Sequence, residues 1–144
     1  AGLIRYIGVT TARTSQFAEI EQVMNTLPID FIQLNYSLRD RAAEERLLPL
    51  AIDKGIAVMV NRPFAHSNLF KDVINLTLPD WAIEAGCSSW PQFFLKYVVS
   101  HPAVTCAIPG TTKSAHVRDN MLAAHGVLPD SAFRRRQEQW FADL

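Results

Sequence analysis

The sequence predicts an α/β protein whose parallel sheet is built from four strand–helix units. Short apolar runs recur at residues 3–9, 30–34, 56–60 and 104–108, and a helical pattern follows each of them. Strands that alternate with helices in this way form βα units around a parallel sheet. The third run is apolar almost without interruption, which suits a strand covered on both faces. We therefore expect one domain over residues 1–144.

The composition supports a single compact domain and argues against two classes of function. The chain has 144 residues, of which 14 are Lys or Arg and 14 are Asp or Glu, so its net charge is zero. A nucleic-acid-binding protein usually carries a basic surplus, which this chain lacks. Its longest apolar run is far shorter than the roughly 20 residues that a membrane helix needs. We therefore expect neither nucleic acid nor membrane as a partner.

The first two helices are expected between the first three strands. Residues 14–15 can cap a helix whose apolar positions recur at helical spacing, and residues 27–28 end it. Asp40 can cap the second helix, which Gly55 ends directly after a lysine. Each of these helices thus fills the interval between two predicted strands.

The remaining helices follow the third strand. They are expected within the gap 61–78, from Pro79 to Glu84, from Ser89 to residues 101–102, over 113–124, and from 129 to the C-terminus. Aromatic residues at 90, 93, 94 and 97 have helical spacing and are expected to pack in the core. The Arg134-Arg135-Arg136 run in the last helix is expected to be solvated.

The cysteine and histidine patterns predict no metal site and no disulfide framework. Cys87 and Cys106 lack the spacing of zinc ligands, and both are expected to be small buried hydrophobes. The four histidines form no cluster along the sequence. We therefore expect no metal cofactor.

Polar residues gather where the predicted strands end. Parallel βα units place the C-terminal ends of their strands on one rim, where the following loops converge and bind ligands. The residues at these ends are Thr10 and Thr11 after the first strand, Gln33 and Asn35 on the second, Asn61, Arg62, Pro63 and Phe64 after the third, and Ile108, Pro109, Gly110, Thr111 and Lys113 after the fourth.

Three of these groups have both a binding and a structural interpretation. The loop 110–113 offers N–H groups, hydroxyls and a cation before a helix, which suits a phosphate, but it can equally be a plain capped loop with a solvated lysine. Gln33 and Asn35 share one face of a strand and can bind a carboxamide or close an internal polar network. Arg62 can pair with an anionic group or bridge two loops.

Four stretches in register resemble the C-terminal half of the aldo/keto reductase family. They are IRYIGVTT at 4–11, the segment from IDFIQLNY to VNRPF at 29–64, SWPQFF to VRDN at 89–120, and the LPD that opens the last helix. The resemblance covers essentially the whole chain. It implies an eight-stranded TIM-type (β/α) barrel, of which this chain supplies the last four βα units and a C-terminal helix.

The resemblance assigns the first three strand ends to the nicotinamide side of a bound NADPH. Gln33 matches the glutamine that binds the nicotinamide carboxamide. Thr10 and Thr11 stand where the family usually carries Ser-Asn, which alters that contact. Asn61 stands at the place of a tyrosine that stacks on the nicotinamide, and residues 62–64 replace the usual Ser-Pro-Leu, a variant that points to a bacterial-type subfamily.

The fourth strand end is similarly assigned to the phosphates and the adenine. The resemblance implies that Gly110, Thr111 and Lys113, which follow Ile108-Pro109, hold the pyrophosphate and the adenosine 2′-phosphate. His116 stands where the family often has an arginine or glutamine, one turn into the helix that could bind phosphate. Asn120 matches the asparagine on the adenine side.

No residue of this chain can be assigned to proton donation. The Asp, Tyr, Lys and His of the family's catalytic tetrad lie on the first four strands and their loops, which precede everything that matches here. The resemblance therefore implies the cofactor-binding half of an NADP-dependent oxidoreductase that reduces aldehydes and ketones to alcohols. The alternatives are a non-catalytic half-barrel or pseudoenzyme module that binds a nucleotide or phosphate, and a different (β/α) barrel enzyme with a phosphate site.

Four strands alone leave two open edges and an uncovered face. The chain also begins with Ala1 rather than Met. We therefore expect a fragment of a longer protein, which aggregates, self-associates or pairs with the missing N-terminal half-barrel. A chain that folds cooperatively as a monomer would argue against this expectation. Cytoplasm is the default compartment, although an upstream segment has room for an export signal.

Overall fold

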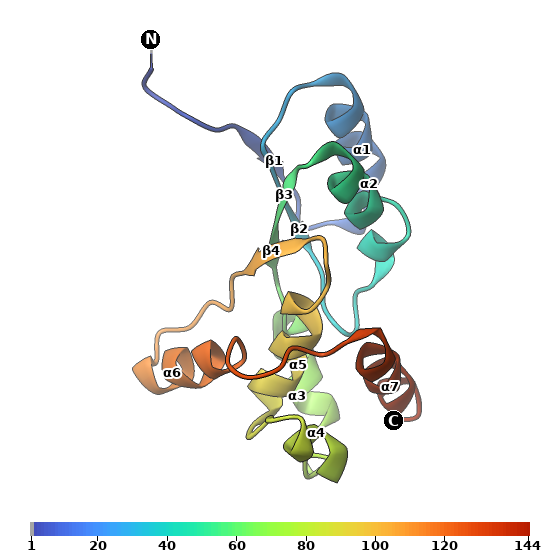
Figure 1. Ribbon diagram of the computed structural model, residues 1–144, viewed down its shortest axis with the longest axis vertical. Helices are drawn as coiled ribbons and strands as arrows, with labels where there is room; N and C mark the ends of the chain where they lie inside the picture. Colours follow the sequence, from blue (N-terminus) through green and yellow to red (C-terminus); the bar gives the residue numbers. More distant parts are fainter. Residues whose placement is uncertain (1) are drawn as a thin grey trace.

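The computed structural model describes residues 2–144, and its centre is a four-stranded parallel sheet (Figure 1). The strands are β1 (Gly8–Thr10), β2 (Phe31–Asn35), β3 (Ala57–Asn61) and β4 (Val104–Ala107). They pair in chain order, β1-β2-β3-β4, and every pair is parallel. This arrangement confirms the predicted α/β fold built from four βα units.

Helices connect and follow the strands. The α-helices are α1 (Phe17–Thr26), α2 (Leu47–Lys54), α3 (Asn68–Asp72), α4 (Asp80–Glu84), α5 (Trp90–Val99), α6 (Ser114–Leu122) and α7 (Ser131–Ala142), and the 3₁₀ turns are η1 (Thr14–Gln16), η2 (Ala42–Glu44) and η3 (Ala65–Ser67). None of the helices in the described part of the chain is both long and apolar enough to cross a membrane.

The caps explain several of these bounds. Ser89 caps α5 as expected, because its side chain accepts a hydrogen bond from the backbone N–H of Gln92. Gly55 ends α2 in the left-handed conformation, with φ of 67°, where glycine carries no steric penalty. The expected cap at residues 14–15 is wrong, since these residues form η1. Asp40 does not cap α2 either, because η2 intervenes before the helix begins.

The sheet buries one face and leaves the other open. Ile32, Leu34, Val58 and Val60 are fully buried in the core. The alternate residues Phe31, Gln33, Ala57 and Met59 are only half-buried, and Cys106 on β4 is exposed. Figure 1 shows α1 and α2 on the same side of the sheet. Two expectations are therefore wrong: β3 is covered on one face only, and Cys106 is not a buried hydrophobe.

The first strand is shorter than expected. Residues 3–7 were expected to extend it, but β1 begins at Gly8, and Leu3 and Ile4 are 92% and 75% exposed. At the start of β1, a Cβ on Gly8 would lie 2.5 Å from the backbone oxygen of Phe31. Glycine thus permits the close approach of β1 to β2. Of the residues before it, Ile7 still accepts hydrogen bonds from the backbone N–H groups of Asp30 and Phe31, at 2.9 and 3.2 Å.

The aromatic residues of α5 form the core, as expected. Phe93, Phe94 and Tyr97 are fully buried, and the half-buried Trp90 stacks on Phe94 with ring centroids 5.8 Å apart. The last helix joins this core through Trp140, whose ring centroid lies 5.4 Å from that of Trp90.

Arg134 is buried, so the expectation that the whole arginine run is solvated is wrong for this residue. Its side chain donates to Glu44 Oε1 at 2.9 Å and to the Tyr36 hydroxyl at 2.7 Å. The Tyr97 hydroxyl also donates to Glu44 Oε1 at 2.9 Å. We call these four residues the Arg134 network. It ties the C-terminal helix to η2, to α5 and to the segment after β2.

The Arg134 network also sets the protonation of its members. Burial raises the pKa of the Tyr36 and Tyr97 hydroxyls. Burial alone would also raise the pKa of the Glu44 carboxyl, but hydrogen bonds from the two tyrosines and the charge of Arg41 hold that pKa below its usual value. Glu44 is therefore a carboxylate at neutral pH.

Candidate functional site

Side chains from three strand ends meet at the rim of the sheet. Thr10 Oγ1 donates to Gln33 Oε1 at 3.3 Å, and the backbone N–H of Thr11 donates to Gln33 O at 2.8 Å. Asn61 Nδ2 donates to Thr11 O at 3.0 Å. We call Thr10, Thr11, Gln33 and Asn61 the strand-end cluster. Sequence reasoning placed these residues on one rim, and the structure brings them into hydrogen-bond contact.

Asn61 has one amide atom without a partner. Its Oδ1 is buried and accepts no hydrogen bond within the described residues, and the same is true of Asn35 Oδ1, whose residue is its register partner. An unsatisfied buried acceptor costs about 1–3 kcal/mol. Two neighbouring strands thus each carry a buried amide oxygen without a hydrogen-bond partner in the described residues.

Arg62 connects two of the loops. Its guanidinium donates to Ala12 O at 2.7 Å, so it tethers the loop after β1 to the end of β3. Of the two interpretations from sequence, a bridge between loops describes this contact, although the acceptor is a backbone carbonyl rather than a carboxylate. The backbone of Arg62 is left-handed, with φ of 52°.

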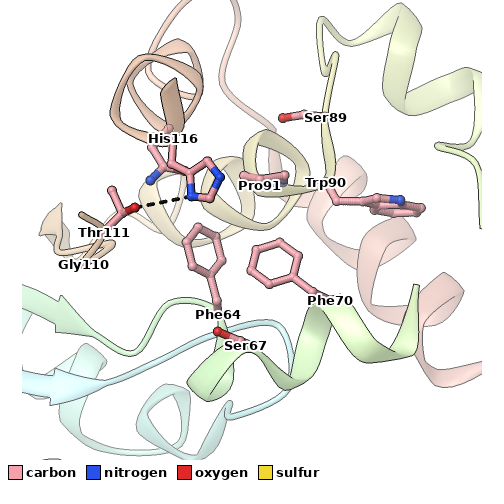
Figure 2. Close-up of a pocket in the computed structure, with 10 residues that line it drawn as sticks. Phe64, Ser67, Phe70, Ser89, Trp90, Pro91, Gly110, Thr111 and His116 are labelled. Carbon is pink, nitrogen blue, oxygen red and sulfur yellow. Dashed lines mark hydrogen bonds between the residues drawn. The ribbon is translucent and has the colours of Figure 1, made fainter. Parts of the chain in front are cut away.

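A cavity of about 600 Å³ lies beside the strand ends (Figure 2). It is enclosed by the segment after β3, the start of α5, the loop after β4, and α6. Its lining residues are Phe64, Ser67, Phe70, Ser89, Trp90, Pro91, Gly110, Thr111, His116 and Asn120. Phe64, Gly110, Thr111, His116 and Asn120 were singled out from the sequence, and the structure brings all five to one cavity.

One wall of the cavity is aromatic. The Phe64 and Phe70 ring centroids lie 4.9 Å apart, and Figure 2 shows both rings facing the His116 ring and the start of α5. Sequence reasoning assigned Trp90 to the core because of its helical spacing, and it did not single out Phe70. The segment below this wall is unusual, since Ala65, His66 and Ser67 all have positive φ.

The opposite wall is the loop that leads into α6. The backbone N–H of Lys113, the N-cap residue, donates to Thr111 Oγ1 at 3.2 Å, and His116 Nδ1 lies 3.3 Å from the same hydroxyl oxygen. The first N–H groups of an α-helix have no intrahelical acceptor and carry partial positive charge. The loop 110–113 and the start of α6 therefore offer an anion-binding end next to an apolar wall.

Besides the strand-end cluster and Arg62, four more of the expected site residues do not line this cavity. Lys113, the N-cap residue of α6, is exposed, and Pro63, which follows β3, is buried. The backbone N–H of Ile108 donates to Val60 O at 2.8 Å, which continues the pairing of β4 with β3. Pro109 lines a second, mostly apolar cavity of about 330 Å³ beside Cys106.

Gly110 is not required by the fold. Its φ lies outside the left-handed region, and an added Cβ would meet no atom within 4 Å. The contrast with Gly8 is direct, because a Cβ there would collide with the neighbouring strand. Gly110 instead leaves a stretch of backbone bare at the cavity wall.

Within residues 2–144 the structure contains no group of three or more His, Cys, Asp or Glu side chains that could hold a metal ion. The polar atoms that face the rim and the cavity are amides, hydroxyls, an imidazole and backbone N–H groups. Such a set suits hydrogen bonding to a neutral amide and to anionic oxygens.

Comparisons with known proteins agree with this architecture. Residues 1–140 match the family model described as "Aldo/keto reductase family". Pyridoxine 4-dehydrogenase of Escherichia coli is 31% identical over 122 residues, which are 85% of this chain and 40% of that protein. The NADH-specific methylglyoxal reductase of Escherichia coli is 28% identical over 90% of this chain and 47% of its own length.

A solved structure gives the same result at the level of the fold. The aldo/keto reductase from Klebsiella pneumoniae, solved in complex with NADP and acetate, superposes with a TM-score of 0.75 at 24% identity. The alignment covers 97% of this chain and 49% of that one. The chain thus spans about half the length of the relatives that it matches.

Proposed function

Because the chain belongs to the aldo/keto reductase family, we propose that it supplies the NADP-binding half of a (β/α) barrel that reduces aldehydes and ketones to alcohols. The observation that carries the proposal is the meeting of the strand-end cluster, the aromatic cavity and the start of α6 on one rim. These parts match the three chemical parts of NADP, which are an amide, an apolar base and phosphates.

The strand-end cluster fits the nicotinamide carboxamide. A carboxamide both donates and accepts hydrogen bonds, and the buried Asn61 Oδ1 is an acceptor without a partner within residues 2–144. Gln33 Oε1 already accepts from Thr10, which leaves its Nε2 as the donor for the carboxamide oxygen. Gln33 and Asn61 would thus fix the plane of the nicotinamide at the end of the sheet.

The cavity and α6 fit the adenosine end. A volume of about 600 Å³ lies within the range of small-molecule sites. The Phe64 and Phe70 rings offer an apolar surface to a base, and Asn120 adds an amide. Thr111, the N–H groups at the start of α6 and the Lys113 cation would hold the phosphates.

The chain's part in the reaction is to bind and orient. NADPH supplies the hydride when it is bound. Gln33 and Asn61 would hold the carboxamide so that one face of the ring points away from the sheet. The resemblance places the proton donor in the first half of the barrel, so we assign no catalytic residue within this chain.

The open face of the sheet fits the rest of a barrel. Phe31 and Met59 are only half-buried on this face, and Cys106 beside them is exposed. We propose that a further half-barrel, from the same polypeptide or from a partner, covers this face. A second copy of this chain is the other occupant that the sequence suggests.

The test is the preference for the 2′-phosphate. In the purified protein, Lys113→Ala should weaken NADPH by about tenfold, or about 1.4 kcal/mol, and leave NADH nearly unchanged. The matched control is Lys54→Ala, an exposed lysine at the far end of α2. Equal weakening of both nucleotides would remove the assignment of Lys113. Failure of the unmodified protein to bind either nucleotide would remove the proposed function itself.

A further inference from the structure

The C-terminal helix α7 packs one face on α5. Phe133, Gln137 and Trp140 recur at the spacing of a single helix face. Gln137 is buried, and its Nε2 donates to Phe93 O at 2.9 Å. The Trp140 ring also lies edge-to-face against the Phe93 ring, with the centroids 5.5 Å apart. This face of α7 therefore seats the helix on α5.

Trp140 also contacts a residue that lines the cavity. Its ring stacks on that of Trp90, with the centroids 5.4 Å apart and the planes at 24°. Trp90 stacks in turn on Phe94, at 5.8 Å and 21°, and its indole N–H donates to Leu76 O at 3.2 Å. Figure 2 shows the Trp90 ring pointing away from His116 and toward the ribbon of α7. Trp140 is thus one of two stacked partners that hold the Trp90 ring in place.

The aromatic contacts continue from Trp90 into the wall of the cavity. The Phe94 and Phe70 ring centroids lie 5.8 Å apart, and those of Phe70 and Phe64 lie 4.9 Å apart. We call Trp140, Trp90, Phe94, Phe70 and Phe64 the aromatic row. It runs without a break from α7 to the wall, and three of its members line the cavity. Because packed aromatic side chains leave little free space, a shift at one end of the row is felt at the other.

We propose that Trp140 is a positioning residue, which couples the docking of α7 to the binding of a ligand in the cavity. The inference rests on the proposed function, since it takes this cavity as the adenosine end of the NADP site. Trp140 does not itself line the cavity, so its effect passes through Trp90 and the rest of the aromatic row. When α7 leaves its seat, Trp90 loses a stacked partner and the aromatic wall loses its support. The docked state therefore binds the ligand more tightly than the undocked state.

Trp81 provides a matched control, because it also seats α7 but is not part of the aromatic row. Its ring centroid lies 5.7 Å from that of Phe93 on α5 and 5.2 Å from that of Phe133 on α7. The Arg136 guanidinium of α7 lies 4.5 Å from the same centroid. Within residues 2–144 its aromatic ring contacts go to Phe93 and Phe133, neither of which lines the cavity. Removal of either tryptophan side chain should thus loosen α7, but only removal of Trp140 should change the cavity.

The coupling predicts the same factor in two measurements. An aromatic contact changes an equilibrium constant by about tenfold at most, and we expect about half of this limit, so Trp140→Ala should weaken adenosine 2′,5′-bisphosphate about fivefold. Nicotinamide mononucleotide should bind as before, because the strand-end cluster shares no residue with the aromatic row. Since coupling is reciprocal, saturating bisphosphate should slow the amide exchange of residues 131–142 by the same factor, about fivefold. The helix is docked with and without ligand, so the coupling affects its exchange rates rather than its average position.

The experiment titrates the purified chain with these two probes separately, by calorimetry, for the unmodified protein and three variants. Trp140→Phe keeps a ring against Trp90 and should retain most of the affinity that Trp140→Ala loses. Trp81→Ala should bind both probes as the unmodified protein does. Hydrogen exchange with and without the bisphosphate gives the second readout. The amides of α7 should exchange faster in both alanine variants, but the bisphosphate should slow them only in Trp81→Ala.

The outcomes separate the two proposals. If the unmodified chain does not bind the bisphosphate, the proposed function fails and this inference fails with it. If the unmodified chain binds and Trp140→Ala binds equally well, only the coupling is overturned. Equal weakening in Trp81→Ala, or equal weakening of both probes, would show that Trp140 serves general stability and would also overturn it. If Trp140→Ala fails to fold, exchange in the unmodified protein decides, because α7 amides that the bisphosphate does not slow would contradict the coupling.

Discussion

Replacement of Arg134 by leucine should destabilise the protein far more than replacement of its neighbour Arg135. Arg134 donates to Glu44 and Tyr36 at 2.9 and 2.7 Å, and its guanidinium lies 4.2 Å from the centroid of the Tyr97 ring. Leucine can refill part of the volume but makes none of these contacts. The variant therefore leaves the Glu44 carboxylate in a half-buried site with fewer partners.

The magnitude follows from the burial of the pair. Removal of one partner of a buried ion pair costs about 3–5 kcal/mol. The Arg134 and Glu44 side chains are 10% and 21% exposed, and Glu44 retains Arg41 as an ion-pair partner. We therefore expect a loss at the lower end, about 3 kcal/mol, in the free energy of unfolding. Urea denaturation followed by tryptophan fluorescence measures it.

The matched control is Arg135→Leu, which changes an exposed residue on the same helix and should alter stability by less than about 0.5 kcal/mol. Acid gives a second check. The pKa of Glu44 is lowered in the folded state. Its contribution to the free energy of unfolding is therefore present above the pKa of the unfolded state and is lost as the pH falls through the pKa of the folded state. The reasoning is refuted if the two leucine variants unfold at the same urea concentration.

Three further predictions concern glycines, acid and thiols. Gly8→Ala should destabilise the fold, because the new Cβ would lie 2.5 Å from a backbone oxygen of β2. Gly110→Ala, whose new Cβ would meet no atom within 4 Å, should leave the urea midpoint unchanged and weaken the binding of NADPH. Burial and the charge of Arg134 lower the pKa of the His101 imidazole in the folded state. The contribution of His101 to stability should therefore be complete above the unfolded-state pKa of 6.5 and should fall as the pH drops toward the folded-state pKa. A His101→Gln variant that keeps the same pH dependence of the urea midpoint would contradict this. Cys106 is exposed and Cys87 is buried, so a thiol reagent should modify the first in the native state and the second only after unfolding; rapid native modification of Cys87, read by mass spectrometry, would show that the core is open.

The sequence predicted the elements that local signals define. The alternation of apolar runs and helical spacing located β2, β3 and α5, because both signals depend on neighbouring residues alone. It failed where the outcome depends on distant partners. Cys106 is exposed because the face that it occupies is uncovered, and Arg134 is buried because Glu44, far along the chain, supplies an acceptor. The run of arginines in the sequence does not by itself indicate that pairing.

The candidate site shows the same division. The rim could be predicted, since parallel strands must end together, and Thr10, Gln33 and Asn61 do meet there. The aromatic lining could not be predicted, because Trp90 has the spacing of a core residue. Only the three-dimensional arrangement brings Trp90 and Phe70 to the cavity.

The central claim is that one rim of this chain binds both ends of NADP. The most direct test is the titration of isotope-labelled protein with NADPH, followed by backbone amide chemical shifts in NMR spectra. The account predicts saturable shifts at residues 110–116 and at Gln33 and Asn61, with little change in α1 and α7. Saturable shifts confined to another surface, or no shifts at millimolar NADPH, would contradict it.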